Sequence, residues 1–354
     1  MKVAVDCRYV TPGRHNGISR YTAGIVRELA ALHPVTLLIS DEAQLAQLPG
    51  APWVRVSAPT SVREPLVARA VNRVGADVVF SPMQTMGSWG RRYRLVLTLH
   101  DLIYYHHPAP PPEFNAGIRL LWRLYHLAWW PQRLLLNRAD AVVTVSETSA
   151  AAIAEQRLTR RPVTVVPNAA EPAPDPSRLP RERALVYMGT FMPYKNVETL
   201  VRAAALLPGF TLHLMSRVTP AERARLTALA PGADLVFHDG ADDATYRDLL
   251  RRATALVSAS RDEGFGIPLV EAMGVGTPVV VSDIPVFREV GGDTAAYVDP
   301  DDVAGFVRAV RALDDDAVWT ERSKAARCRG EHYTWAGSAR ILLALLERVA
   351  AASP

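Results

Sequence analysis

Residues 261–300 read R-D-E-G-F-G-I-P-L-V-E-A-M-G-V-G-T-P-V-V-V-S-D-I-P-V-F-R-E-V-G-G-D-T-A-A-Y-V-D-P and combine two carboxylates with a glycine-rich turn. Pro268 predicts a helix that begins there, because a proline at the first helical position gives up only an amide without a partner. Glycines after the helix predict its end. A helix N-terminus preceded by glycines is an anion site. With Glu263 before the helix and Glu271 in its first turn, the segment fits a ligand with central phosphates and hydroxyls at both ends, as in a nucleotide sugar.

The same stretch resembles, nearly position by position, the donor-binding segment of the retaining glycosyltransferases of family 4. The shared motifs are S-x-x-E-G-F-G-x-P-x-x-E-A-M, then G-x-P-V-V-x-S-D, and finally E-V and V-D-P. The resemblance implies the GT-B fold, an α/β architecture of two Rossmann-like doubly wound domains that face each other across a cleft. In this family, donor and acceptor meet in that cleft.

Length and composition are those of a folded protein with two domains. The chain has 354 residues, of which 49% are hydrophobic and 21% are charged, and domains commonly have about 100–200 residues each. No uncharged apolar run reaches the roughly 18 residues of a membrane-spanning helix, and the N-terminus lacks the layout of a signal peptide. The two cysteines, Cys7 and Cys328, lie far apart in the sequence. We therefore expect a cytoplasmic protein without a disulfide framework.

Charge is unevenly distributed along the chain. Residues 1–170 hold 19 Arg and Lys against 11 Asp and Glu, a balance of +8, whereas the remainder holds 21 against 25, a balance of −4. A basic first half favours an anionic or lipid-linked acceptor, or peripheral contact with the inner face of the cell membrane. The alternative is that these arginines form ordinary solvated surface. We expect no nucleic-acid partner.

Two tandem series of strands and helices predict the domain organisation. Apolar β-branched runs alternate with helical stretches in both halves, as in parallel sheets covered by helices on both faces. Residues 170–180, A-E-P-A-P-D-P-S-R-L-P, hold four prolines and are the best linker candidate. The expected parts are an N-terminal acceptor-binding domain at 1–169, the linker at 170–180, a C-terminal nucleotide-sugar-binding domain at 181–334 and a closing helix at 335–354.

The strands of the two domains are expected where these apolar runs occur. The runs of the first half lie at 2–6, 35–40, 76–81, 94–101, 139–146 and 163–168, and those of the second half lie at 184–190, 210–216, 233–239, 253–260 and 277–283. Ligands in open α/β sheets bind at the carboxyl ends of the strands. Residues that directly follow these runs are therefore the candidates for a site.

The motif Y-M-G-T-F-M-P-Y-K-N at 187–196 follows the first strand of the second half. Gly189 allows the backbone to turn close to a ligand, and Lys195 lies where the next helix begins. In the family this segment supplies an arginine or lysine pair to the leaving diphosphate. Lys195 matches the lysine, but Thr190 stands at the usual arginine position, so one expected cation is missing there.

Two motifs of the first half also resemble the family. In H-N-G-I-S-R-Y-T at 15–22, Gly17 precedes an expected helix at 19–32 and matches the glycine loop whose backbone faces the donor phosphates; Arg20 is a candidate acceptor contact. In T-L-H-D-L-I at 98–103, His100 matches the family's V-H-D-L motif. The resemblance implies that His100 contacts the transferred sugar or the acceptor. Asp101 is a candidate acceptor contact, like Arg20, and a candidate for orienting the His100 imidazole.

The stretch I-R-L-L-W-R-L-Y-H-L-A-W-W-P-Q-R-L-L-L at 118–136 mixes aromatic, leucine and arginine residues. Amphipathic segments of this kind can lie on a membrane surface. The alternatives are a helix that packs on its own domain with its arginines outward, and a helix that helps to bind the acceptor.

The resemblance assigns roles to the remaining candidates. Glu271 is expected to hold the ribose hydroxyls through its carboxylate, and Glu263 to bind hydroxyls of the donor sugar as a catalytic residue with His100 and Lys195. The helix N-terminus at Pro268–Leu269 would stabilise charge on the leaving diphosphate. The backbone amides expected near the sugar or the diphosphate are those of Phe265, Gly266 and Ile267.

These features predict a retaining hexosyltransferase that moves a sugar from a nucleoside diphosphate to a hydroxyl acceptor in polysaccharide, glycolipid or glycoconjugate assembly. GDP-mannose is weakly favoured as donor and a UDP-sugar comes next. No metal-ligand spacing occurs, so we expect no cofactor and metal-independent transfer. The alternatives are a glycosidase that uses Glu263 and Glu271, a nucleotide-sugar epimerase or phosphorylase on the same fold, and a non-catalytic sugar-nucleotide-binding protein.

Overall fold

The computed structural model describes residues 1–13, 17–108, 116–171 and 179–352. The chain divides into two compact units, of which the first joins Met1–Ala169 to Thr334–Pro354 and the second is Ala170–Tyr333. Most of the linker expected at 170–180 falls on 172–178, outside the described residues. The C-terminal segment expected as a closing helix belongs to the first unit.

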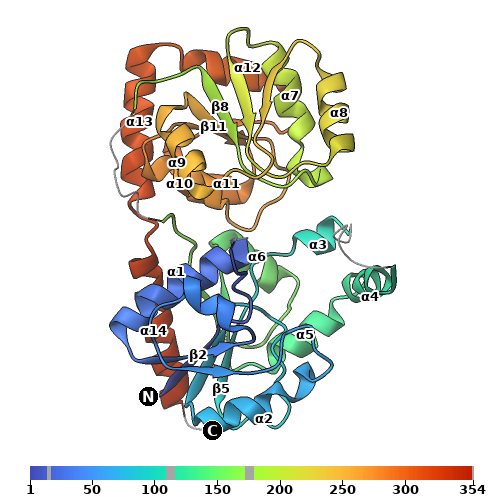
Figure 1. Cartoon of the computed structure of the whole chain (residues 1–354), viewed down its shortest axis with the longest axis vertical. Helices are drawn as coiled ribbons and strands as arrows, with labels where there is room; N and C mark the ends of the chain where they lie inside the picture. The colour runs from blue at the N-terminus through green and yellow to red at the C-terminus, as the bar shows by residue number, and fades with distance from the viewer. Residues whose placement is uncertain (14–16, 109–115, 172–178, 353–354) are drawn as a thin grey trace. The chain divides into compact units, whose positions relative to one another are not determined.

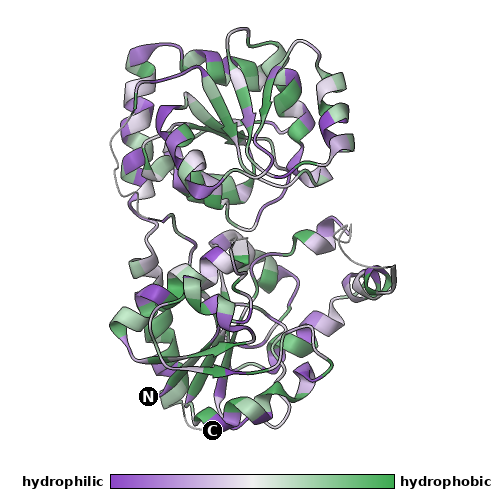
Figure 2. Cartoon of the chain, in the orientation of Figure 1, coloured by the Kyte–Doolittle hydropathy of each residue, from purple (hydrophilic) through white to green (hydrophobic). Residues whose placement is uncertain are grey.

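The first unit is built on seven parallel strands in the order β3-β2-β1-β4-β5-β6-β7. Because β1 lies inside the sheet and later strands add on both sides of it, the unit is doubly wound, as predicted. Its strands are mostly buried and apolar (Figure 2). They are β1 (Val3–Asp6), β2 (Val35–Ile39), β3 (Trp53–Arg55), β4 (Val78–Ser81), β5 (Arg94–Thr98), β6 (Ala141–Thr144) and β7 (Val163–Val165).

Two features of this sheet differ from the prediction. Strand β3 was not expected, because its three residues are all exposed at the sheet edge and lack a buried apolar run. Strand β5 ends at Thr98, so His100 and Asp101 lie in the loop after it. Both residues remain at the carboxyl edge of the sheet, where ligands of such folds bind.

Most helices of the first unit lie against its sheet, whereas α4 extends away from it (Figure 1). Helices α1 and α14 pack side by side, and a Cβ added at Gly24 would lie 2.4 Å from Cε2 of Trp335. The absence of a side chain at Gly24 therefore lets the Trp335 indole lie directly against α1. The helices are α1 (Gly17–Leu32), α2 (Val67–Val71), α3 (Ile103–His106), α4 (Ala116–His126), α5 (Trp130–Asn137), α6 (Glu147–Glu155) and α14 (Trp335–Ala351).

The stretch 118–136, expected as one amphipathic segment, forms two helices, α4 and α5. Pro131 stands in the first turn of α5. A proline inside a continuous helix would remove one backbone hydrogen bond and clash with the preceding turn. The segment therefore breaks before Pro131 and starts a new helix.

The second unit is built on six parallel strands in the order β10-β9-β8-β11-β12-β13. It repeats the doubly wound arrangement and confirms that two Rossmann-like domains follow one another in the chain. The strands are β8 (Ala184–Tyr187), β9 (Thr211–Leu214), β10 (Asp234–Phe237), β11 (Ala255–Ser258), β12 (Val279–Ser282) and β13 (Ala296–Val298). The helices are α7 (Val197–Ala205), α8 (Pro220–Leu229), α9 (Asp243–Arg252), α10 (Ile267–Gly274), α11 (Pro285–Gly291), α12 (Val303–Ala312) and α13 (Asp316–Gly330).

Each unit has buried apolar clusters of its own. In the second unit one cluster joins β8, β9 and β11 to α7 and α12. A separate core for each unit is what independently compact domains require. Among the helices of the described residues, none combines the length and apolar character needed to span a membrane.

Candidate functional site

The loop that follows β11 ends in a left-handed glycine, which sets the start of α10. Gly266 has a φ of 95° and caps the helix, and a Cβ added to it would lie 2.9 Å from Cε1 of Phe287. This position therefore requires glycine for two reasons. Left-handed backbone favours glycine, and the Phe287 ring leaves no room for a Cβ. The helix therefore begins at Ile267, one residue earlier than expected.

This start corrects two details of the prediction. Pro268 is the second helical residue, and Glu271 lies in the second turn, because the first turn of α10 holds no acidic residue. The first amides of a helix have no acceptor inside it. Pro268 has no amide hydrogen, and Leu269 donates to the Gly266 carbonyl at 2.9 Å. Of Ile267, Pro268 and Leu269, the Ile267 amide is thus the donor for which no acceptor is found within the described residues, and it can donate to an anion.

Lys195 approaches this helix from the loop after β8. It ends a short 3₁₀-helix, η4 (Pro193–Lys195), and Asn196 follows it in the left-handed conformation at the start of α7. The side-chain amide of Asn196 donates from Nδ2 to the Pro300 carbonyl at 2.6 Å, which fixes this turn. The Arg261 amide donates to the Tyr194 carbonyl at 2.8 Å. The loops after β8 and β11 are therefore joined.

The Lys195 ammonium and the Glu263 carboxylate form an ion pair, with 2.6 Å between Nζ and Oε1. The two side chains are only 15% and 14% exposed. The structure thus brings together the expected cation and the expected sugar-binding carboxylate. The sequence assigned them to different parts of the donor and did not predict this contact.

A residue that sequence reasoning did not select, Tyr187, supports the same loop. Its hydroxyl donates to the Thr190 carbonyl at 2.6 Å, while the Gly189 amide donates to Ser216 Oγ at 3.3 Å. A Cβ at Gly189 would lie 2.7 Å from the Tyr187 hydroxyl. Burial, and then the nearby charge of Glu263, raises the pKa of Tyr187 well above its usual value. The tyrosine is therefore a neutral donor that fixes the turn; its place in the Y-M-G-T motif was the available signal.

The other donor candidates of the second unit differ in what they expose. The side chains of Phe265 and Leu269 are buried, and the Phe265 ring meets that of Tyr333 edge to face at 5.4 Å. Their side chains are therefore not available to a ligand, and the role expected of the Phe265 backbone amide stays a prediction. Ile267 and Glu271 are half-buried, whereas Thr190 is exposed.

The first unit holds the remaining candidates, and His100 is the best defined of them. Its Nε2 lies 2.8 Å from the Pro82 carbonyl, and its ring meets that of Tyr21 edge to face at 5.0 Å. Burial lowers the pKa of His100 to about 4. The imidazole is therefore neutral at pH 7, and because a carbonyl can only accept, Nε2 carries the proton and Nδ1 is left as the acceptor.

Gly17 and Arg20 both lie on α1, the helix that carries Tyr21. Gly17 is the first residue of this helix rather than part of the loop before it, and most of the expected glycine loop falls on 14–16, outside the described residues. Asp101 Oδ1 accepts the Ile103 amide at 3.0 Å and so supports the start of α3. In this unit, then, His100 and the start of α1 are connected through Tyr21.

No three His, Cys, Asp or Glu side chains within the described residues come together as metal ligands would. The donor candidates that the structure brings into contact are Lys195 and Glu263. They lie in the loops that enter α7 and α10, at the carboxyl ends of β8 and β11. The strand order reverses between β8 and β11. In a doubly wound sheet, ligands usually bind at such a switch point.

Sequence comparison matches both units to known families. Residues 16–169 match a family described as "Glycosyl transferase 4-like domain", and residues 182–316 match "Glycosyl transferases group 1". The O-antigen chain mannosyltransferase RfbU of Salmonella typhimurium is 27% identical over 247 residues, which are 65% of this chain and 64% of that protein. The chain therefore spans slightly less than two thirds of this relative's length.

Solved structures confirm the GT-B fold. A sucrose-phosphate synthase from Thermosynechococcus elongatus superposes with a TM-score of 0.76 at 22% identity, covering 99% of this chain and all of that one (100%). Anabaena HepE, solved in complex with UDP and glucose, superposes with a TM-score of 0.73 at 17% identity, covering 98% of this chain and 100% of that one. At these identities the likeness is one of fold.

Proposed function

Because this chain belongs to the group 1 glycosyltransferases, we propose that it transfers a sugar from a nucleoside diphosphate to a hydroxyl acceptor with retention at the anomeric carbon. The observation that carries the proposal is the contact between Lys195 Nζ and Glu263 Oε1, 2.6 Å long, in the two loops that enter α7 and α10. A cation and a carboxylate beside a helix N-terminus can serve the phosphate and the hydroxyls of one donor.

The hard step is departure of the diphosphate, and its developing charge must be stabilised. Lys195 supplies a full positive charge, and the Ile267 amide supplies a donor at the positive end of the α10 dipole. Thr190, at the position where the family usually has arginine, is exposed and neutral. More of this stabilisation therefore falls on Lys195 and α10. Retention implies that the acceptor hydroxyl attacks the face from which the diphosphate leaves. NMR of the first product tests this, and an inverted anomeric centre would refute the proposal.

Donor recognition is assigned to the two glutamates. Glu263 binds hydroxyls of the donor sugar, and Glu271, in the second turn of α10, binds the ribose hydroxyls. Glu271→Ala then raises the donor KM and leaves kcat nearly unchanged, because ribose contacts are made equally in the ground state and the transition state. An unchanged KM would remove Glu271 from the site.

The donor we propose is GDP-mannose, with a UDP-sugar as the second candidate. The mannose preference is supported by the O-antigen mannosyltransferase among the relatives, whereas the HepE neighbour was solved with UDP. A thermal-shift series with GDP, UDP, dTDP and ADP decides between them, because a ligand that binds only the folded state raises Tm. The largest shift with UDP would overturn the proposal for GDP.

The acceptor we propose is a hydroxyl of a growing glycan, which is anionic or lipid-linked. We also propose that transfer needs no metal. Under this proposal EDTA leaves the rate unchanged. Nucleotide-sugar epimerase, phosphorylase and sensor functions on the same fold are distinguished by incubating the protein with labelled donor alone. A transferase releases nucleoside diphosphate slowly by hydrolysis, whereas a sensor releases none and an epimerase returns an isomerised donor.

We also propose peripheral contact with an anionic membrane through α4 and α5. Leu120 and Leu124 on α4 and Leu127, directly after the helix, are exposed, and their spacing of four and three residues favours one face. The neighbouring positions hold Arg119 and Arg123, for which no ion pair is found within the described residues. Leucines beside arginines suit a surface of acyl chains and lipid phosphates.

Vesicle cosedimentation tests the membrane proposal. The protein is expected to bind vesicles that contain phosphatidylglycerol more strongly than vesicles of phosphatidylcholine alone. Leu120→Ser with Leu124→Ser weakens that binding, whereas Leu206→Ser, at an exposed leucine of the second unit, leaves it unchanged. Equal sedimentation of both variants would overturn the proposal.

A further inference from the structure

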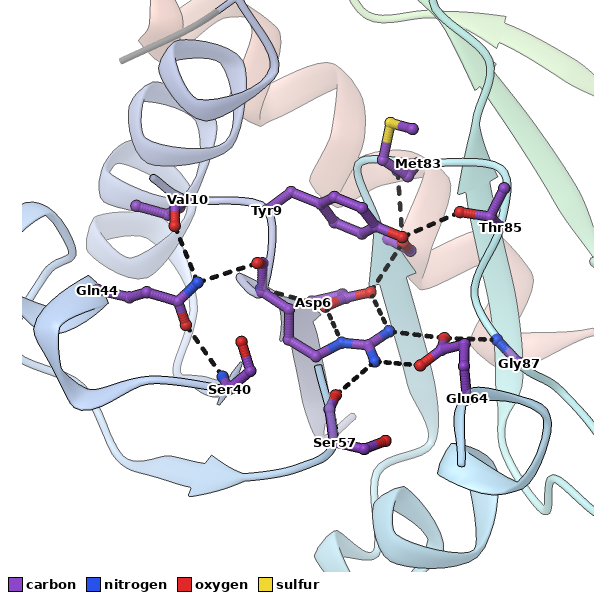
Figure 3. A network of polar contacts seen from close by, with 12 residues as sticks. Asp6, Tyr9, Val10, Ser40, Gln44, Ser57, Glu64, Met83, Thr85 and Gly87 are labelled. Atoms are coloured by element: carbon purple, nitrogen blue, oxygen red, sulfur yellow. Dashed lines mark hydrogen bonds and ion pairs between the residues drawn. The ribbon is translucent and has the colours of Figure 1, made fainter. Parts of the chain in front are cut away.

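A buried network of charges lies at the carboxyl end of β1 (Figure 3). The Arg8 guanidinium contacts Asp6 through Nε–Oδ1 at 2.7 Å and Nη2–Oδ2 at 2.9 Å, and contacts Glu64 through Nη1–Oε2 at 2.5 Å and Nη2–Oε1 at 3.0 Å. Asp6 and Arg8 are almost completely buried. Breaking such a pair would leave an uncompensated buried charge, so the network ties the short helix η2 (Glu64–Leu66) firmly to β1.

The same network holds the loop between β4 and β5. Glu64 Oε1 accepts the Gly87 amide at 3.0 Å, and the Tyr9 hydroxyl lies 3.0 Å from Thr85 Oγ1 (Figure 3). Further along the loop, the Asn72 side chain donates to the Gly90 carbonyl at 2.8 Å and accepts the Arg92 amide at 2.8 Å. The loop backbone is therefore held on both sides of Trp89.

Trp89 itself is 71% exposed. An exposed tryptophan on a tethered loop is unusual for a side chain that only packs, because such rings normally bury a large apolar area. Here the backbone that carries the indole is held in place on both sides. A ligand that stacks on the ring therefore has to order the side chain but not the loop.

Trp89 borders a cavity of about 660 Å³ in the first unit, a volume within the usual range of ligand pockets. Its lining combines apolar and polar residues. The apolar ones include Met86 and Leu135, and the polar ones include Ser88 and Arg138. Arg138 forms no ion pair within the described parts of the chain.

We propose that this cavity is a glycan-binding subsite that holds a sugar of the acceptor chain away from the site of transfer, an inference that rests on the proposed function. A pyranose ring has an apolar face of C–H groups, which stacks on an indole, and hydroxyls around its edge. Those hydroxyls find the Ser88 hydroxyl and the Arg138 guanidinium, which can donate several hydrogen bonds in a fixed geometry. A growing glycan supplies such rings in succession.

The adjoining helix is consistent with a lipid-linked chain as the occupant. Leu135 of α5 and Arg138, the residue directly after this helix, line the cavity, while Trp130 and Leu134 of α5 are exposed. A glycan attached to a membrane lipid would lie beside the helix that we propose to contact the membrane. A membrane surface that occupies the cavity itself is the competing occupant, and the experiment separates the two.

Binding is measured first without donor, by saturation-transfer NMR and calorimetry with α-linked mannotetraose and with maltotetraose as probes. We expect the wild-type protein to bind one of them, and Trp89→Ala to weaken that binding about tenfold, the value of a lost aromatic stack. Trp89→Phe keeps an aromatic face and retains most of the affinity. Trp53→Ala removes a tryptophan that is 42% exposed on β3, outside the cavity, and serves as the matched control.

Transfer assays then connect the cavity to the reaction. Trp89→Ala should raise KM for an oligosaccharide acceptor about tenfold and leave KM for a monosaccharide acceptor unchanged. Arg138→Gln gives a second variant with the same pattern if the alanine variant does not fold. Equal binding by the Trp89→Ala and Trp53→Ala variants, or no saturable binding by the wild type, overturns the subsite.

If Trp89→Ala loses vesicle binding but keeps glycan binding, Trp89 contacts the membrane instead. This result also overturns the glycan subsite. Failure of the proposed function has a different signature. In that case the oligosaccharide binds through Trp89 and no donor supports transfer.

Discussion

Lys195 Nζ lies 2.6 Å from Glu263 Oε1, although the two residues are 68 positions apart in the chain. Each side chain is largely buried by the loops that enter α7 and α10. In this ion pair each charge offsets the other before a donor binds. A diphosphate that binds to Lys195 must therefore compete with Glu263, and a sugar hydroxyl that binds to Glu263 can take the place of the ammonium.

This ion pair leads to a first prediction. Glu263→Gln should lower kcat at least about a hundredfold, because a preorganised charge beside the reacting sugar is lost, while nucleotide affinity stays close to that of the wild type. Lys195→Met should weaken binding of the diphosphate. In a double-mutant cycle for unfolding the two changes should couple by about 1–2 kcal/mol. Activity of Glu263→Gln within a few-fold of wild type would refute the catalytic assignment.

Tyr187 is predicted to act through the loop after β8, which carries Thr190 and Lys195. Tyr187→Phe removes the hydrogen bond to the Thr190 carbonyl, so we expect the donor KM to rise and the unfolding free energy to fall by about 1 kcal/mol. Tyr297→Phe, which loses a 2.6 Å hydrogen bond to the Gly292 carbonyl elsewhere in the unit, should show the stability loss alone. The same donor KM in both variants would mean that Tyr187 is only structural.

Gly266 is predicted to be irreplaceable at the start of α10. Gly266→Ala places a Cβ 2.9 Å from Phe287 Cε1 at a φ of 95°, and it should lower the unfolding free energy by roughly 1–2 kcal/mol or more. Gly232→Ala is the control, because a Cβ there has no neighbour within 4 Å. Both variants are compared by urea denaturation. An equal midpoint for the two would show that the turn tolerates a side chain.

His100 predicts a stability change below neutral pH. Its folded-state pKa is about 4, below the ordinary value of 6.5, because of burial. The unfolded chain therefore binds the proton more readily, so the stability from neutral His100 is complete above pH 6.5 and is lost as pH falls toward 4. The loss is at most about 3 kcal/mol. In urea denaturation at several pH values, His100→Gln should show a smaller decline over this range, and a parallel decline would contradict the assignment.

The sequence by itself determined the two-domain plan and most of the candidate site. Continuous apolar runs marked nearly all the strands, because a parallel sheet buried on both faces needs them. Glycine, proline and acid spacing marked α10 and the residues around it. The same logic missed β3, whose exposed edge position needs no apolar run.

Contacts between distant residues were decided only by the tertiary structure. Which loops meet decides the pairing of Lys195 with Glu263 and the hydrogen bond that holds Thr190. How far His100 is buried decides that its imidazole is neutral. The tethered position of Trp89 likewise follows from Glu64 and Asn72, which are far from it in sequence. Local propensity acts along the chain, whereas distance and burial are set by packing, and these contacts follow from packing.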